Sequence, residues 1–367
     1  MELIHILVLL AAASGVTLIV TPIVRDMGLR AHLVDKPTAR KVHTAAVPRL
    51  GGIGIVSGFA AALLVEVAGE LLWGWPHTVL LGDGQILGTV LGVAVIFALG
   101  LVDDVRGMKA GVKFAGQLLA AAVPIAFGLR IEFFSNPFGG GRLPLEWWLS
   151  VPLTLFWLVG FANVFNLIDG LDGLAAGVAG IAAASFLALA MDMHQLLAAV
   201  LATSLIGALG GFLRYNFSPA SIYMGDSGSL SIGFVLGCVS LTGVMKSAAA
   251  ISLVAPLLII GVPLFDTMSA IIRRRRHGRP IHEADNGHIH HRLLHKGFTQ
   301  RQTVLIIYAW AGALAVGGYA MREEVLHSAV ARLAVLVVML GASGLVARQL
   351  GLFQPARVHG EGTNPRG

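Results

Sequence analysis

Two amides and two carboxylates recur at every third position directly after an apolar run. The four residues are Asn163, Asn166, Asp169 and Asp172. Positions three apart lie on neighbouring turns of one helix face, so a helix through this stretch would present one polar stripe. Asn and Asp can hydrogen-bond a nucleobase or ribose, and Asp can bind Mg²⁺. Carboxylates at the edge of a hydrocarbon layer are costly, which favours a functional site over a polar seam between helices.

A pair of acids, Asp103 and Asp104, ends another apolar run. Adjacent helical residues point about 100° apart, so a regular helix cannot aim both at one ligand. The pair is suited to binding Mg²⁺ or to accepting a proton from a phosphate. The alternative is a solvated helix end with Arg106 as counter-charge. Lys113, a few residues later, could neutralise a phosphate.

A third acid, Asp226, lies between two glycines in the segment Tyr223-Met224-Gly225-Asp226-Ser227-Gly228, where a new helix is expected. Asp226 is either an N-cap or a metal ligand beside a phosphate. Tyr223 offers an aromatic ring for stacking on a base, and Asn216 belongs to the same short loop.

Two basic segments complete the set of candidate residues. The first runs from Asp35 to Gly52 and includes Arg49, and the second contains four consecutive arginines, Arg273 to Arg276. The second segment continues with imidazoles and acids at His282, Glu283, Asp285, His288, His290, His291 and His295. Zinc binding is one interpretation, but histidines beside arginines are better suited to holding a diphosphate. Both segments could also anchor the chain to anionic lipid.

The composition indicates a membrane protein. Of the 367 residues, 56% are hydrophobic and 13% are charged, whereas soluble domains have about 25% charged residues. Runs of about 20 apolar residues are long enough to span a bilayer as helices. We therefore predict an all-α integral membrane protein with about eleven transmembrane helices, at 3–24, 51–72, 86–102, 114–129, 148–165, 174–191, 196–213, 230–244, 251–272, 304–320 and 329–347.

The basic residues predict an orientation. Most of the 26 Lys and Arg residues fall between alternate helices if the N-terminus is outside and the C-terminus is cytoplasmic. The same rule explains the net charge of +6 without nucleic acid. All the polar clusters then lie on the cytoplasmic face, within one domain at 1–352 that is followed by a disordered tail at 353–367. The single Cys238 excludes an intramolecular disulfide.

The ordered set of motifs resembles the polyprenyl-phosphate N-acetylhexosamine-1-phosphate transferase family. The matching segments are Asp35-Lys36-Pro37, Arg40-Lys41-Val42-His43, Pro48, Gly51-Gly52, Leu101 to Asp104, Asn163 to Gly173, Asn216, Tyr223 to Gly228, Asp285 and His288 to His291. The resemblance implies a bundle of ten or eleven transmembrane helices with a cytoplasmic cleft. It also implies transfer of a sugar 1-phosphate from a UDP-sugar to undecaprenyl or another polyprenyl phosphate in the cell membrane, with release of UMP.

The resemblance assigns roles as well. Asp226 matches the magnesium ligand, Asp103 the acid that deprotonates the lipid phosphate, and Asp104 its essential neighbour; both could also contact the metal. Asn166, Asp169, Gly170 and Leu171 match the nucleoside-recognition segment, with Tyr223 stacking on uracil. His288, His290 and His291 match a motif near the sugar phosphate. We add Lys113 to the catalytic candidates and Asn163, Asp172, Asn216 and Arg49 to the substrate-binding ones. Mg²⁺ is the expected cofactor, Mn²⁺ its alternative, and a homodimer is an open alternative to a monomer.

Within the family, the spacing His288-Ile289-His290-His291 is similar to the branch that uses UDP-N-acetylglucosamine. The alternative is a phospho-N-acetylmuramoyl-pentapeptide transferase, which typically has consecutive histidines. A prenyltransferase would require Asp-X-X-X-Asp motifs, and the residues after Asp104 do not form one. A nucleotide-sugar transporter would place charges near the bilayer midplane and show an internal repeat.

Overall fold

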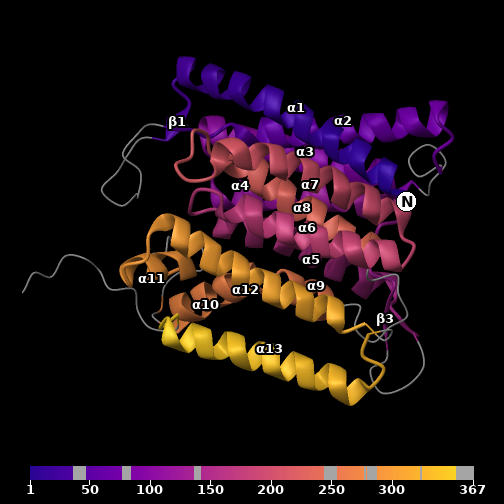
Figure 1. Ribbon diagram of the computed structural model, residues 1–367, viewed down its shortest axis with the longest axis vertical. Helices are drawn as coiled ribbons and strands as arrows, with labels where there is room; N and C mark the ends of the chain where they lie inside the picture. Colours follow the sequence, from indigo (N-terminus) through magenta and orange to yellow (C-terminus); the bar gives the residue numbers. More distant parts are fainter. Residues whose placement is uncertain are drawn as a thin grey trace, which may run out of the picture.

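The computed structural model describes the chain except residues 36–46, 77–83, 136–141, 244–253, 277, 279–286, 323–324 and 353–367. The described part is almost entirely helical, which confirms the predicted fold class (Figure 1). Two short antiparallel ladders connect helices: β1 (Val34–Asp35) pairs with β2 (Val47–Pro48), and β3 (Phe133–Ser135) pairs with β4 (Arg142–Pro144). The predicted tail at 353–367 lies outside the described residues.

The helices follow the apolar runs of the sequence closely. They are α1 (Leu3–Arg30), α2 (Gly51–Leu72), α3 (Gln85–Arg106), α4 (Ala110–Ala126), α5 (Trp147–Ile168), α6 (Leu174–Asp192), α7 (Leu196–Asn216), α8 (Gly225–Gly243), α9 (Val254–Ile259), α10 (Gly261–Arg276), α11 (Ile289–His295), α12 (Gln300–Ala320) and α13 (Ala329–Gln349). In the described part of the chain, eight of them are long and apolar enough to cross a membrane. The protein is therefore a multi-pass membrane protein.

The single helix predicted over 251–272 is wrong. Its described part consists of two helices, because α9 ends at Ile259 and α10 begins at Gly261. Pro263 has no N–H group to donate to the carbonyl of Ile259, so the regular hydrogen-bond ladder is interrupted there. The hydrophobic run was visible in the sequence, but the break inside it was not predicted.

Helix α8 forms the centre of the bundle, and its described residues are buried from Ser227 to Gly243. It packs against α3, α5, α7, α2 and α6. Small residues allow this close packing. A Cβ atom on Gly100 of α3 would lie 2.5 Å from the Cα of Ser227, and one on Gly233 would lie 2.4 Å from the carbonyl oxygen of Phe161 on α5. The start of α8 is therefore surrounded by its neighbours' backbones.

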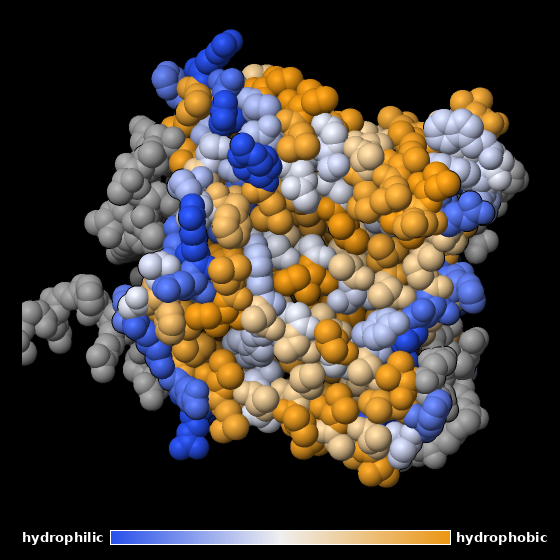
Figure 2. Space-filling view, viewed as in Figure 1, coloured by the Kyte–Doolittle hydropathy of each residue, from blue (hydrophilic) through white to orange (hydrophobic). Residues whose placement is uncertain are grey.

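The bundle has two polar ends separated by apolar surface. The β1–β2 ladder and α11 lie at one end, on the left of Figure 1, and the N-terminus lies at the other. Figure 2 shows a band of hydrophilic side chains along that left edge, a smaller hydrophilic group on the right, and mostly apolar surface between them. Helix α13 lies at the edge of the bundle with apolar side chains such as Val330 and Val338 exposed. This surface is suited to contact with lipid.

Candidate active site

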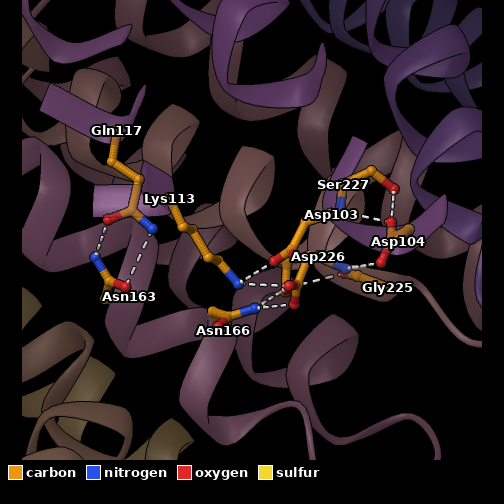
Figure 3. Close-up of polar contacts among 10 residues, drawn as sticks. Asp103, Asp104, Lys113, Gln117, Asn163, Asn166, Gly225, Asp226 and Ser227 are labelled. Carbon is orange, nitrogen blue, oxygen red and sulfur yellow. Dashed lines mark hydrogen bonds and ion pairs between the residues drawn. The ribbon is translucent and has the colours of Figure 1, made fainter. Parts of the chain in front are cut away.

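The carboxylate of Asp226 lies where three other helices meet the first turn of α8 (Figure 3). Lys113 of α4 forms an ion pair with it, and the same ammonium lies 2.8 Å from Asp103 Oδ2 on α3. Asn166 of α5 donates through Nδ2 to Asp226 Oδ1 at 2.6 Å and to Ser229 Oγ at 2.9 Å. The fold therefore brings together four predicted site residues from four different helices.

Asp104 has a different task from its neighbour Asp103. Its Oδ1 accepts from the backbone N–H of Asp226 at 2.7 Å, while Oδ2 accepts from the backbone N–H and the hydroxyl of Ser227 at 2.9 and 2.6 Å. Backbone N–H groups in the first turn of a helix have no partner within that helix, and this carboxylate supplies one from α3. Asp104 thus fixes the start of α8, while Asp103 contacts Lys113. The pair divides its tasks, as the divergence of adjacent helical side chains predicts.

Gly225 makes this arrangement sterically feasible. Its φ is +68°, a left-handed conformation that glycine adopts without strain. A Cβ atom there would lie 2.1 Å from the carbonyl oxygen of Arg49 and 2.6 Å from the Asp104 carboxylate. The start of α2 also holds this segment, because the N–H groups of Gly51 and Gly52 donate to the carbonyls of Tyr223 and Met224 at 2.9 and 2.8 Å.

The continuous polar stripe expected from Asn163 to Asp172 is wrong beyond Asn166. Helix α5 ends at Ile168, so Asp169 and Asp172 lie in the turn before α6. Gly173, with φ +78°, allows the chain to turn there. Within the helix, Asn163 donates to Gln117 Oε1 at 2.7 Å rather than reaching Asp226. Gln117 is a buried partner that the sequence analysis missed.

The turn between α5 and α6 is held by its own polar residues. Asp172 Oδ2 accepts from the N–H of Ala220 at 3.0 Å. Asn216 accepts from the N–H of Gly173 at 3.1 Å and donates to the carbonyl of Ile222 at 2.9 Å. Asp172 and Asn216, predicted to bind substrate, therefore join this turn to the loop before α8, and Leu171 is buried within it.

Asp169 differs from the other acids because its surroundings favour the protonated form. Burial raises the pKa of Asp169 to about 8, and the negative charges of Asp226 and Asp104 contribute in the same direction. The protonated form of the carboxyl group is therefore favoured at neutral pH, and this form can both donate and accept hydrogen bonds. Such a group is suited to a neutral polar ligand, in keeping with its predicted part in nucleoside recognition.

The histidine motif packs against this turn. His290 is buried beside Gly170, where a Cβ atom would lie 2.5 Å from the imidazole Cε1 and Nε2 atoms. Burial lowers the pKa of His290 to about 3, with the positive charge of His291 as the second cause. The neutral form of His290 is therefore favoured at neutral pH. His291 is half-buried, and its ring centroid lies 4.2 Å from that of His290.

Asp266 is a partner of the histidine motif that the sequence analysis missed. It lies on α10, and its Oδ2 is 2.8 Å from His288 Nδ1. The available signal was an acid inside the apolar run 251–272, which is expensive in a membrane helix. No local pattern indicated that its partner would be His288.

Of the remaining predicted residues, some lie beside the start of α8 and others lie outside the described part of the chain. Arg49 is exposed and Tyr223 is half-buried, both beside the start of α8. Outside the described residues lie Lys36, Pro37, Arg40, Lys41, Val42, His43, His282, Glu283 and Asp285.

The acids fit a magnesium ion that is completed by substrate. Among the described residues, no three or more His, Cys, Asp or Glu side chains are grouped to hold a metal. Mg²⁺ however is usually held by one or two carboxylates together with water and substrate phosphates. The Lys113 ammonium contacts the carboxylates of both Asp103 and Asp226, so these two acids lie on either side of one positive charge. A cation between these two carboxylates is thus compatible with the fold.

Comparison with known proteins identifies the family. Residues 86–244 match the model of glycosyl transferase family 4. The probable undecaprenyl-phosphate N-acetylglucosaminyl 1-phosphate transferase of Bacillus subtilis is 38% identical over 307 residues, covering 84% of this chain and 82% of that protein. The decaprenyl-phosphate N-acetylglucosaminephosphotransferase of Mycolicibacterium smegmatis is 38% identical over 326 residues, covering 83% and 79%.

A relative from the alternative branch is also similar. The phospho-N-acetylmuramoyl-pentapeptide-transferase of Desulforudis audaxviator is 34% identical over 348 residues, covering 87% of this chain and 98% of that protein. Each of these relatives matches most of both chains, and the matches include the helices that carry Asp103, Lys113, Asn166 and Asp226. The chain belongs to the polyprenyl-phosphate N-acetylhexosamine-1-phosphate transferase family.

Proposed function

We propose that the protein transfers N-acetylglucosamine 1-phosphate from UDP-N-acetylglucosamine to undecaprenyl phosphate or a similar polyprenyl phosphate. The products are UMP and a polyprenyl diphosphate sugar that starts a cell-envelope glycan. The observation that carries this proposal is the convergence of Asp103, Lys113, Asn166 and Asp226, from four helices, at one end of a membrane bundle. The relatives named for N-acetylglucosamine support this choice of donor.

The donor nucleoside fits the turn between α5 and α6. The raised pKa of Asp169 favours its protonated form at neutral pH, and this form can exchange hydrogen bonds with uracil or ribose without adding negative charge near a diphosphate. The loops on either side are tied together through Asp172 and Asn216, which keeps the turn in place. Tyr223 lies beside the start of α8 and supplies an aromatic ring for the base.

The main obstacle to the reaction is electrostatic, because a phosphate anion must attack a diphosphate. Phosphoryl transfer is catalysed mainly by positioning and by neutralising charge. Asp226 would hold Mg²⁺, which would draw negative charge from the diphosphate. Asn166 orients the Asp226 carboxylate through its 2.6 Å hydrogen bond, and Lys113 supplies a positive charge between the two acids.

Bond making and breaking need no covalent enzyme intermediate. An oxygen of the lipid phosphate attacks the sugar-bearing phosphorus of the donor, the bond from this phosphorus to the bridging oxygen breaks, and the electron pair leaves with UMP. Asp103 accepts the last proton of the lipid phosphate, so the phosphate attacks in its fully ionised form. The alternative is a two-step route with Asp103 as nucleophile, and trapping a phosphosugar on Asp103 would establish that route.

The membrane explains why the site lies at the end of the bundle. A polyprenyl phosphate keeps its tail in hydrocarbon and its phosphate at the interface, so the reacting groups must lie near helix ends. We place this end on the cytoplasmic side, with the N-terminus outside, because the basic residues gather there. Labelling of single cysteines introduced at Arg106 and near the N-terminus by an impermeant reagent tests this orientation.

One assay tests the function. Purified protein is incubated with Mg²⁺ and undecaprenyl phosphate, together with either UDP-N-acetylglucosamine or UDP-N-acetylmuramoyl-pentapeptide, and UMP release is measured. We expect release with the first donor. Release with the second donor alone would assign the chain to the peptidoglycan branch. Uptake of UDP-sugar into vesicles without UMP release would identify a transporter, and no release with either donor would refute the transferase proposal.

A further inference from the structure

Asp266 is a buried acid to which the function proposed above gives no task. Only 1% of its surface is exposed, and it lies on α10 among apolar residues. Both of its oxygens are nevertheless bonded: Oδ2 lies 2.8 Å from His288 Nδ1, and Oδ1 accepts from the N–H of Ile289 at 2.8 Å. A buried charge is tolerated when it is paired in this way. Asp266 therefore joins α10 to the residues that begin α11.

This pairing selects one form of the His288 imidazole. An ionised carboxylate can only accept hydrogen bonds, so Nδ1 of His288 must carry the proton. The other ring nitrogen, Nε2, is then the one that can bond to a ligand. A carboxylate partner on one nitrogen commonly fixes the orientation and basicity of the other. The arrangement resembles a support for a functional imidazole more than a chance surface ion pair.

A line of rings leads from His288 to the turn that is proposed to bind the donor. The rings of His288 and His290 are almost parallel, with centroids 5.7 Å apart and an interplanar angle of 6°. His290 is buried against Gly170, whose missing side chain leaves room for the imidazole. A shift of His288 would therefore be transmitted to His290 and then to the backbone at Gly170.

We propose that Asp266 is a positioning residue of the transfer reaction, which holds His288 in one tautomer and orientation so that Nε2 faces the donor diphosphate. Through His290, it also supports the turn at Gly170. This inference rests on the proposed function, because it assigns Asp266 to the site that binds the UDP-sugar. Asp266 touches no reacting atom itself, and its effect passes through His288.

The test uses the variant Asp266→Asn in the full-length protein. Asparagine keeps the shape and can still accept from the N–H of Ile289, but its amide presents N–H groups to Nδ1 and favours the wrong tautomer. We expect kcat for UMP release to fall ~10- to 100-fold. The KM for UDP-N-acetylglucosamine and the melting temperature should change little, because the turn and the fold remain.

A matched control is Ser269→Ala on the same helix. Ser269 is equally buried, and its hydroxyl donates to the backbone carbonyl of Asp266 at 2.8 Å, not to the carboxylate. We expect kinetics like those of the wild type. The decisive comparison adds Asp266→Asn to a His288→Gln background, where it should reduce kcat less than about threefold, since coupled residues have non-additive effects.

Three results would overturn the proposal: full activity of Asp266→Asn, a loss equal to that of Ser269→Ala, or an undiminished effect in the His288→Gln background. If Asp266→Asn does not fold, ¹⁵N NMR of histidine-labelled wild-type protein decides instead, with His288→Gln used to assign the signal. A protonated Nδ1 on His288 supports the proposal and an unprotonated Nδ1 contradicts it. Failure of the proposed function is a separate result, because the wild type itself would then release no UMP.

Discussion

The acidic side chains at the two polar ends of the bundle have different neighbours. At the end opposite the site, two acids each have a basic partner: buried Glu66 pairs with His5, and Asp192 pairs with Arg322 and also accepts from the Tyr319 hydroxyl at 2.7 Å. Asp192 ends α6, roughly 27 Å along the helix from the turn at the site. These contacts join neighbouring helices and leave little charge available.

At the site end, acids are gathered close together. Asp103 and Asp226 share the ammonium of Lys113, Asp104 bonds to the start of α8, and the pKa of Asp169 is raised by burial and by the charges of Asp226 and Asp104. Carboxylates this close repel one another unless a cation or a proton intervenes. This contrast supports the proposal that the acids gathered at the start of α8 bind a cation and a charged substrate, whereas the paired acids at the other end join helices.

The largest effect is expected from Asp226→Asn, which removes one of the two carboxylates that contact Lys113. Activity should fall by roughly 10²- to 10³-fold, corresponding to several kcal/mol of lost charge stabilisation. UMP release measures this loss, and the melting temperature shows whether the fold persists. A fully active variant would contradict the assignment of Asp226.

The next largest effect is expected from Gly225→Ala. The added Cβ would lie 2.1 Å from the carbonyl oxygen of Arg49. The alanine would also have to adopt a φ of +68°. Left-handed strain alone costs about 1–2 kcal/mol for a non-glycine residue, and the clash adds to it. Thermal unfolding in detergent should show a clear decrease, with Gly180→Ala as the control, because nothing lies within 4 Å of a Cβ atom at Gly180. Equal melting temperatures for the two variants would refute the close approach at Gly225.

A smaller effect, visible as a pH dependence, is expected from Asp169→Asn. The folded-state pKa of Asp169 is raised to about 8. Its contribution to the free energy of unfolding is therefore fully present at low pH, decreases as the pH rises toward 8, and does not change further above that pH. The asparagine variant has no group that titrates at this position. The melting temperature of the variant relative to the wild type should therefore increase from pH 5 to 8 and then level off, without metal or nucleotide. A constant difference would show that Asp169 has an ordinary pKa.

The smallest effect is expected from Asp192→Asn at the opposite end. Exposed ion pairs contribute about 0–1 kcal/mol, and 40% of the Asp192 side chain is exposed. Activity should match the wild type and the melting temperature should fall slightly. A large loss of UMP release would mean that the two ends are not functionally distinct.

The sequence predicted what local patterns determine. Long apolar runs predicted most of the helices. The position of Asp103, Asp104 and Asp226 at the ends of such runs marked them as candidate site residues. Helical geometry predicted that Asp103 and Asp104 would not share one ligand, but not that Asp104 would bond to the start of α8. These features depend on neighbours in the chain, and a single sequence contains that information.

The sequence could not predict partners that only tertiary packing brings together. Gln117 bonds to Asn163, Asp266 bonds to His288, and nothing local links either pair. The polar stripe was extended past Ile168 because its three-residue spacing continues, although the glycines that follow permit a turn. The break before α10 was missed because hydrophobicity alone does not register the lost hydrogen bond at Pro263.

The most direct test of the central claim is cation binding measured by electron paramagnetic resonance of Mn²⁺, used in place of Mg²⁺ with UDP-N-acetylglucosamine present. We expect one bound Mn²⁺ per chain in the wild type and in Asp192→Asn, and a strong loss of binding in Asp226→Asn. Equal binding by all three proteins, or no binding by the wild type, would contradict the claim that the crowded acids at the start of α8 form the cation site.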